Sequence, residues 1–170
     1  MTMKARTIEG GAVRLVPLGP DHTGCVVRWR NAPQARRAFL SDTPVTAESH
    51  SAWLAGKAGD ASDLTYVIET PDGRAVGMVA LYRIDRGLGT AEFGRLLIGE
   101  PGMQGRGLAA AAARTLIGSV AVPLGLSSVH LEVFADNTRA VALYERLGFV
   151  TDTERPHPSG RRVLHMRRPL

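Results

Sequence analysis

The segment PGMQGRGLAAAAARTL, residues 101–116, places three glycines in a short stretch and follows them, after Leu108, with five alanines. Glycine lets a backbone adopt positive φ and come close to a ligand, whereas alanine is the strongest helix former. The pattern therefore predicts a loop that runs into the first turn of a stiff helix. Because a helix start carries unpaired N–H groups and the positive end of the peptide dipoles, it is a binding site for phosphate groups.

Three interpretations of this segment compete. A loop that only connects two elements is the simplest, since glycines are common in turns. Gly105, Gly107 and Ala110 also satisfy the dinucleotide fingerprint G-x-G-x-x-(G/A). That fingerprint normally sits in a βαβ unit with an acidic residue about 20 residues on, whereas here Glu132 lies inside a predicted strand. A Walker loop is excluded, because no GK(S/T) is present. The third interpretation is a cradle for the pyrophosphate of a different ligand.

Apolar periodicity and turn residues predict the order of elements around this segment. We expect a strand at 12–18, helices at 21–31, 34–40 and from Thr46 to Gly56 or Gly59, a three-strand meander at 64–70, 75–84 and 90–98, the alanine-rich helix to about 122, a strand at 127–135, a helix at 137–148 and a closing pair of strands. This order predicts an α/β (α+β) fold with a mixed, largely antiparallel central sheet of six or seven strands and helices on both faces.

Length and composition limit the class of protein. The 170 residues suit one domain, so residues 1–170 are expected to form a single domain. The N-terminus lacks the apolar core of a signal peptide and no long apolar window follows, which predicts a cytoplasmic protein with no membrane contact. The net charge of +5 favours anionic partners, but no nucleic-acid motif accompanies the dispersed arginines. The five histidines show no metal-ligand spacing, so no metal is predicted.

Two motifs resemble those of the GNAT superfamily of N-acyltransferases. Gln104, Gly107 and Ala109 match its Q-x-x-G-x-(G/A) cradle for the pyrophosphate of coenzyme A, and NTRAVALYERLGF, residues 137–149, matches its second signature. The predicted order of elements also resembles that fold along nearly the whole chain. The resemblance implies that an acetyl or other acyl group passes from acyl-coenzyme A (CoA) to the primary amine of a small metabolite, by direct attack on the thioester.

Weaker similarities bear on the acceptor. WRN at 29–31 and SHSAWL at 49–54 resemble small-amine acetyltransferases, including those that act on nucleotide-linked amino sugars. The spacing of LEV, N and LYE in residues 131–145 resembles that of ribosomal-protein alanine N-acetyltransferases. An amino sugar is therefore one expected acceptor, and a protein N-terminus is the alternative. An acyl-tRNA donor, supported only by the net charge, and a non-catalytic CoA-binding module are the further alternatives.

The resemblance implies catalytic roles for three residues. Tyr144 is the expected acid for the departing thiolate, because a phenol with a pKa of about 10 is protonated at neutral pH. Glu132 is the first candidate for the base, acting through water, and Glu92 is its rival. Ordered water alone is a third option. His50 is the weaker candidate, since it lies on a helix rich in polar residues and such a histidine is commonly solvated.

Binding roles are implied for two further sets of residues. The expected cofactor-binding residues are Leu96, Leu97 and Ile98 through their backbone, the cradle residues Gln104, Gly105, Arg106, Gly107, Leu108 and Ala109, and then Asn137 and Arg139. Capping of the following helix explains Asn137 equally well. The expected acceptor residues are Trp29, Arg30, Asn31 and Trp53. Either tryptophan also fits a core position, and Arg30 with Asn31 suits an anionic or sugar-bearing acceptor. A homodimer is the expected assembly, since two-fold dimers are the commonest oligomers.

Overall fold

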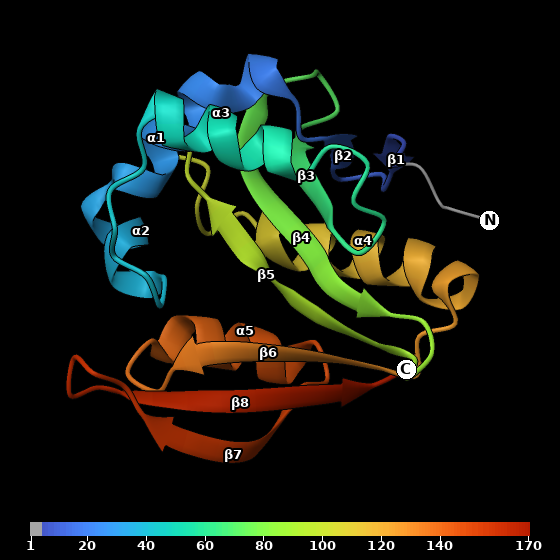
Figure 1. The fold of residues 1–170 in the computed structure, drawn as a ribbon, viewed down its shortest axis with the longest axis vertical. Helices are drawn as coiled ribbons and strands as arrows, with labels where there is room; N and C mark the ends of the chain where they lie inside the picture. Colours follow the sequence, from blue (N-terminus) through green and yellow to red (C-terminus); the bar gives the residue numbers. More distant parts are fainter. Residues whose placement is uncertain (1–4) are drawn as a thin grey trace.

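The computed structural model of the protein describes residues 5–170, so residues 1–4 of the predicted domain lie outside the described residues. One mixed sheet runs through the molecule in the order β1-β2-β3-β4-β5-β6-β8-β7 (Figure 1). Among the described strands only β5 and β6 pair in parallel, which confirms a largely antiparallel sheet. Within residues 5–170 the sheet has eight strands and not six or seven, because a two-residue strand, Ile8–Glu9, is too short to show any alternation in the sequence.

The strands are β1 (Ile8–Glu9), β2 (Arg14–Pro17), β3 (Leu64–Glu69), β4 (Ala75–Asp85), β5 (Thr90–Ile98), β6 (Ser128–Phe134), β7 (Val150–Pro156) and β8 (Arg162–Pro169). The helices are η1 (Pro20–His22), α1 (Thr23–Asn31), α2 (Pro33–Ala38), α3 (Ala47–Gly56), α4 (Leu108–Leu124) and α5 (Thr138–Arg146). The predicted helix at 21–31 is therefore a 3-10 turn followed by an α-helix. None of these helices is long and apolar enough to cross a membrane.

Apolar side chains fill both faces of the sheet. On one face, Val79 and Leu81 of β4 pack in the larger core with Leu116 and Ile117 of α4. On the other, Met78 of β4 packs in a smaller core with α1. Successive strand residues point to opposite faces, so one strand supplies both cores. Figure 1 shows α4 behind the sheet and α3 in front of it, which confirms the prediction of helices on both faces.

Strands β5 and β6 separate along their length. Their pairing covers only Thr90–Glu92 of β5 and Ser128–His130 of β6. Further along β5, Met78 pairs with Leu97 while Ala80 pairs with Gly94, so β5 holds one more residue than β4 between these points. That extra residue makes a β-bulge, which bends a strand away from its regular path. The bulge lies where β5 no longer pairs with β6.

Candidate active site

A cleft of about 290 Å³ opens where β5 and β6 separate. It brings Tyr144 of α5 together with Glu92 of β5 and Glu132 of β6. Arg30, Ala38, Phe39, Leu40, Ser41, Tyr82, Phe93, Gly94, Arg95, Leu96, Val133, Asn137 and Ala140 complete its lining. The three predicted catalytic residues therefore share one cavity, although they come from three different elements.

Tyr144 is half-buried in an aromatic cluster. Its ring centroid lies 6.2 Å from that of Phe93 and 5.9 Å from that of Phe149, both in edge-to-face geometry. Burial of the phenol raises the pKa of Tyr144 to about 12. The hydroxyl thus carries its proton at neutral pH and can donate it.

Both candidate bases have an arginine partner. Arg155 donates to both carboxylate oxygens of Glu132, over 3.0 and 3.1 Å. Glu92 accepts from Arg83 over 2.7 Å and from the Tyr82 hydroxyl over 3.0 Å. A substrate amine must therefore approach a carboxylate that already has an arginine beside it. These contacts favour neither glutamate over the other as the base.

The predicted cradle is a glycine turn that leads into the start of α4. Gly107 lies in the left-handed region at φ +75°, directly before α4, and Gly105 has the same φ. Within residues 5–170, no protein group accepts a hydrogen bond from the backbone N–H groups of residues 104–109. These N–H groups, which include those of Arg106, Leu108 and Ala109, are thus available to an anion.

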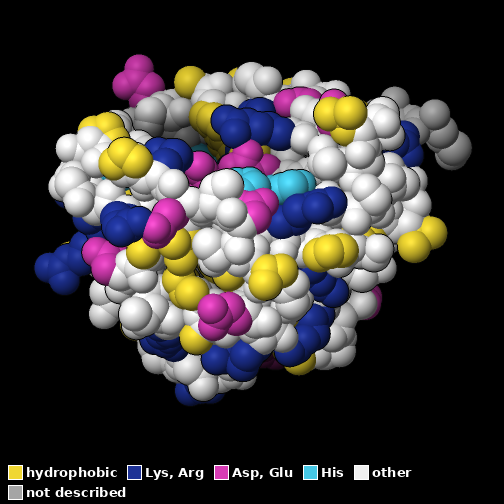
Figure 2. Space-filling model, turned by 90° about the horizontal axis from the view of Figure 1, so that it is seen from below, with side chains coloured by type: hydrophobic (Ala, Val, Ile, Leu, Met, Phe, Trp, Pro, Cys, Tyr) yellow, Lys and Arg dark blue, Asp and Glu magenta, His cyan; other side chains and the backbone are white. Residues whose placement is uncertain are grey.

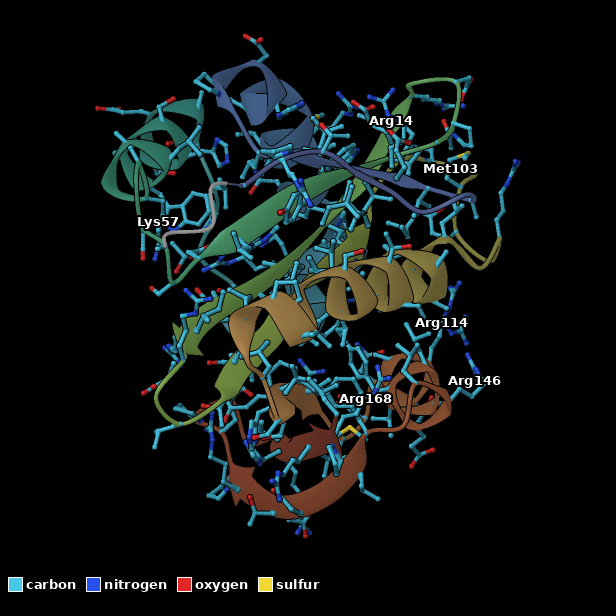
Figure 3. The ribbon with its side chains drawn as sticks, turned by 90° about the vertical axis from the view of Figure 1, so that its right-hand side faces the viewer. Arg14, Lys57, Met103, Arg114, Arg146 and Arg168 are labelled. Carbon is cyan, nitrogen blue, oxygen red and sulfur yellow. The ribbon has the colours of Figure 1, made fainter. Side chains whose placement is uncertain are left out.

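Side chains on either side hold the cradle in position. Met103, labelled in Figure 3, is buried in the larger core and anchors the loop before α4. The Gln104 amide donates to the backbone carbonyl of Ile98 over 2.9 Å. The guanidinium of Arg139 lies 3.9 Å from the position that a Cβ on Gly105 would occupy. Arg139 therefore stands beside the predicted phosphate site.

Three other predicted cofactor residues have different environments. Leu96 lines the cleft and packs against the larger core, whereas Leu97 packs against the smaller core. Asn137 caps α5, where its side-chain oxygen accepts from the backbone N–H of Ala140 over 3.3 Å, and it also lines the cleft. Capping is thus observed for Asn137, and contact with the cofactor stays a prediction.

Of the four predicted acceptor residues, only Arg30 lines the cleft. Trp29 is 1% exposed in the smaller core, and its indole N–H donates to Glu100 over 3.2 Å. The Asn31 amide forms two hydrogen bonds with the backbone of Val45, of 2.6 and 2.9 Å. Trp53 lines a separate pocket. Trp29 is therefore a core residue in this structure, because α1 turns its apolar side into the sheet.

Sequence reasoning missed Arg95 and Tyr82. Arg95 is the bulge residue of β5, with φ +52°. It donates to Asp63 over 2.9 Å and to Thr65 over 2.7 Å, and it stacks 4.1 Å above the centroid of the Tyr82 ring. No local pattern marks these residues, since their meeting depends on the register between β4 and β5.

A cluster of His130, Asp152 and His165 lies on the exposed face of β6, β7 and β8. One ligand atom of each lies within 4.8 Å of the others. Figure 2 shows histidine and acidic side chains gathered on this face. Sequence spacing did not reveal the cluster, because sheet pairing brings the three strands together. Nδ1 of His165 already lies 2.5 Å from Asp152, so these two groups are partnered without a metal, and the absence of a metal stays a prediction.

Comparisons with known proteins identify the class. A family model described as an acetyltransferase (GNAT) domain matches residues 12–150, and the chain belongs to this GNAT family. Spermidine N(1)-acetyltransferase of Escherichia coli is 35% identical over 156 residues, covering 92% of this chain and 77% of that protein. The protein is accordingly an acyl-CoA-dependent N-acetyltransferase that acts on a small amine.

Solved structures agree on the fold. Spermidine N-acetyltransferase from Vibrio cholerae, in complex with CoA and spermine, is 22% identical, with a TM-score of 0.79 and coverage of 93% of this chain and 95% of that one. A probable GNAT-family acetyltransferase from Chromobacterium violaceum is 19% identical, with a TM-score of 0.81 and coverage of 99% and 88%. Because both sequence identities are low, these two structures support the fold of this chain and not its substrate.

Proposed function

We propose that the cleft between β5 and β6 is where acetyl transfer takes place. The amine nitrogen attacks the thioester carbonyl carbon, the C–S bond breaks, and Tyr144 gives its proton to the departing sulfur. Glu132 or Glu92, directly or through water, takes the proton that the amine loses. The observation that carries this proposal is the meeting of the phenol with both carboxylates in one cavity.

The cofactor would enter along α4 and β5. The unpaired N–H groups of residues 104–109 would bind the pyrophosphate, and Arg139 would add a positive charge beside them. On the edge of β5 that faces β6, the backbone groups of Leu96 and its neighbours have no partner strand, although the other edge still pairs with β4. These free groups would hold the pantetheine arm, and one N–H would stabilise the thioester oxygen. This arrangement aims the thioester at Tyr144.

Three kinds of primary amine are candidate acceptors. Two spermidine acetyltransferases among the relatives favour a polyamine, whereas the sequence motifs favour an amino sugar. A protein N-terminus is a third candidate. Family membership favours acyl-CoA over an acyl-tRNA donor and favours catalysis over a purely binding module. A homodimer and a cytoplasmic location stay predictions.

Two measurements test the proposal. Calorimetric titration with acetyl-CoA should give micromolar binding. Release of free CoA should then be followed with a panel of amino sugars, polyamines, amino acids and N-terminal peptides. Failure of acetyl-CoA to bind, or binding without turnover of any primary amine, would contradict the proposed reaction.

Side-by-side substitution separates the candidate bases. Glu132→Gln or Glu92→Gln should lower kcat/KM by about 100-fold, because general base catalysis contributes roughly that much. The matched control is Glu145→Gln, which alters an exposed carboxylate of α5. If both variants stay within about threefold of the native enzyme, neither carboxylate is the base and ordered water takes that role.

A further inference from the structure

The acceptor side of the cleft carries a positive charge that the described part of the chain does not neutralise. The guanidinium of Arg30 lies 3.8 Å above the centroid of the Phe39 ring and forms no ion pair within residues 5–170. Its Nε atom is buried without a hydrogen-bond acceptor. Burial, and then the charge of Arg95, lower the pKa of Arg30. A partly buried cation without a counter-ion is costly, so a ligand anion is the natural missing partner.

A second pocket next to the cleft is also cationic. It has a volume of about 490 Å³ and shares Phe39 and Leu40 with the cleft as lining residues. Arg36, Arg37 and Arg161 line it, against Asp42 as the one acidic residue of its lining. We refer to it as the outer pocket.

The three arginines of the outer pocket differ in the partners that their side chains have. Arg161 is held by Asp136 and by the backbone carbonyl of Arg37, over 2.9 and 2.8 Å, and it lies 3.5 Å above the centroid of the Phe134 ring. Arg36 is 3.9 Å from Asp42. The side chain of Arg37 has no ion pair within the described residues. The positive charges of Arg30 and Arg37 are therefore both available to a ligand.

We propose that the acceptor amine carries an anionic group, a phosphate or a carboxylate, which Arg30 binds while the amine lies beside Tyr144. The rest of the acceptor extends into the outer pocket, whose size is typical of a ligand site. This inference rests on the proposed function and specifies its substrate class. Arginine suits such a group because its planar fork binds carboxylates and phosphates through two parallel hydrogen bonds.

The same charges disfavour a polyamine. A second ammonium group of the acceptor would meet the charge of Arg30, and the carboxylates of Glu92 and Glu132 are already paired with arginines. At an effective dielectric constant of about 20, like charges at contact distance repel strongly enough to lower affinity by about 100-fold or more. We therefore expect this enzyme to differ in substrate from the spermidine acetyltransferases that it resembles.

Matched acceptor pairs test the inference with the full-length enzyme and acetyl-CoA. Ethanolamine is compared with phosphoethanolamine, glucosamine with glucosamine 6-phosphate, and glycinamide with glycine, with spermidine as the polyamine. The phosphate and carboxylate pairs distinguish the two kinds of anion. We expect kcat/KM to be at least about 10-fold higher for the anionic member of a pair, the usual effect of one charged hydrogen-bonded contact.

Arg30→Gln should remove this preference. It should lower kcat/KM of the anionic acceptor by about 10- to 100-fold more than that of the neutral partner. Arg74→Gln, which removes the same charge from the exposed turn between β3 and β4, is the control and should keep the preference. Arg37→Gln provides a second variant, and melting temperatures show whether each one folds.

Three results would overturn the inference while leaving acetyl transfer intact. One is turnover of spermidine or neutral amines equal to that of anionic ones. Another is an equal loss for both members of a pair in Arg30→Gln, since a merely structural role would affect both. The third comes from calorimetric titration of the CoA complex with the same pairs, which measures anion binding without turnover. Equal affinity for ethanolamine and phosphoethanolamine there would contradict the role of Arg30.

Discussion

Substitution of Tyr144 by Phe is expected to lower kcat by about 100- to 1,000-fold, because the departing thiolate loses its proton donor. The change deletes only the hydroxyl. The remaining ring can keep its edge-to-face packing against Phe93 and Phe149, so the fold and the affinity for CoA should hardly change. Steady-state kinetics with a good acceptor and calorimetry with acetyl-CoA measure the two quantities separately.

The pH dependence gives an independent check on this residue. An acid must be protonated to act, and burial raises the pKa of Tyr144 to about 12, so its contribution is lost only as the pH rises through about 12. We expect kcat/KM of the native enzyme not to fall between about pH 8 and pH 10 on account of this group. Full turnover in Tyr144→Phe, with several acceptors, would remove the phenol from the mechanism.

Substitution of Gly107 by Val is expected to weaken CoA binding by about 10- to 100-fold. Gly107 has φ +75°, a conformation that costs an L-residue roughly 1–2 kcal/mol and a β-branched residue more. Space is not the limit, since an added Cβ would have no atom within 4 Å. The strain would instead turn the backbone at the start of α4 and misalign the N–H groups that we expect to bind the pyrophosphate.

Gly73→Val is the matched control for this prediction. Gly73 has φ +86° and equally open surroundings, but it lies in the turn between β3 and β4. Both variants should lose a similar free energy of unfolding in denaturant titrations, and only Gly107→Val should lose affinity for CoA. Unchanged affinity in Gly107→Val would show that the turn before α4 does not bind the cofactor.

Local sequence patterns predicted most of the elements for reasons that are visible in the structure. Thr46 caps α3 by accepting from the backbone N–H of Ser49, as its side chain and position predicted. β5 has the predicted bounds, although burial alternates only from Thr90 to Phe93, before the bulge interrupts it. β1 was not predicted, because two residues cannot show a period. The strand is defined by its pairing with β2, which the local sequence does not reveal.

The sequence by itself determined the order of elements, the glycine turn at the start of α4 and the GNAT family, because caps, turns and periodicity are properties of residues close together in the chain. Only the tertiary structure decided that Trp29 is a core residue, that Arg30 enters the cleft, and that His130 and His165 stand side by side. Those outcomes depend on helix docking, on the bulge in β5 and on strand register. Each of these is set by contacts between distant segments, and a shift of one residue in register would turn every side chain of a strand to the opposite face.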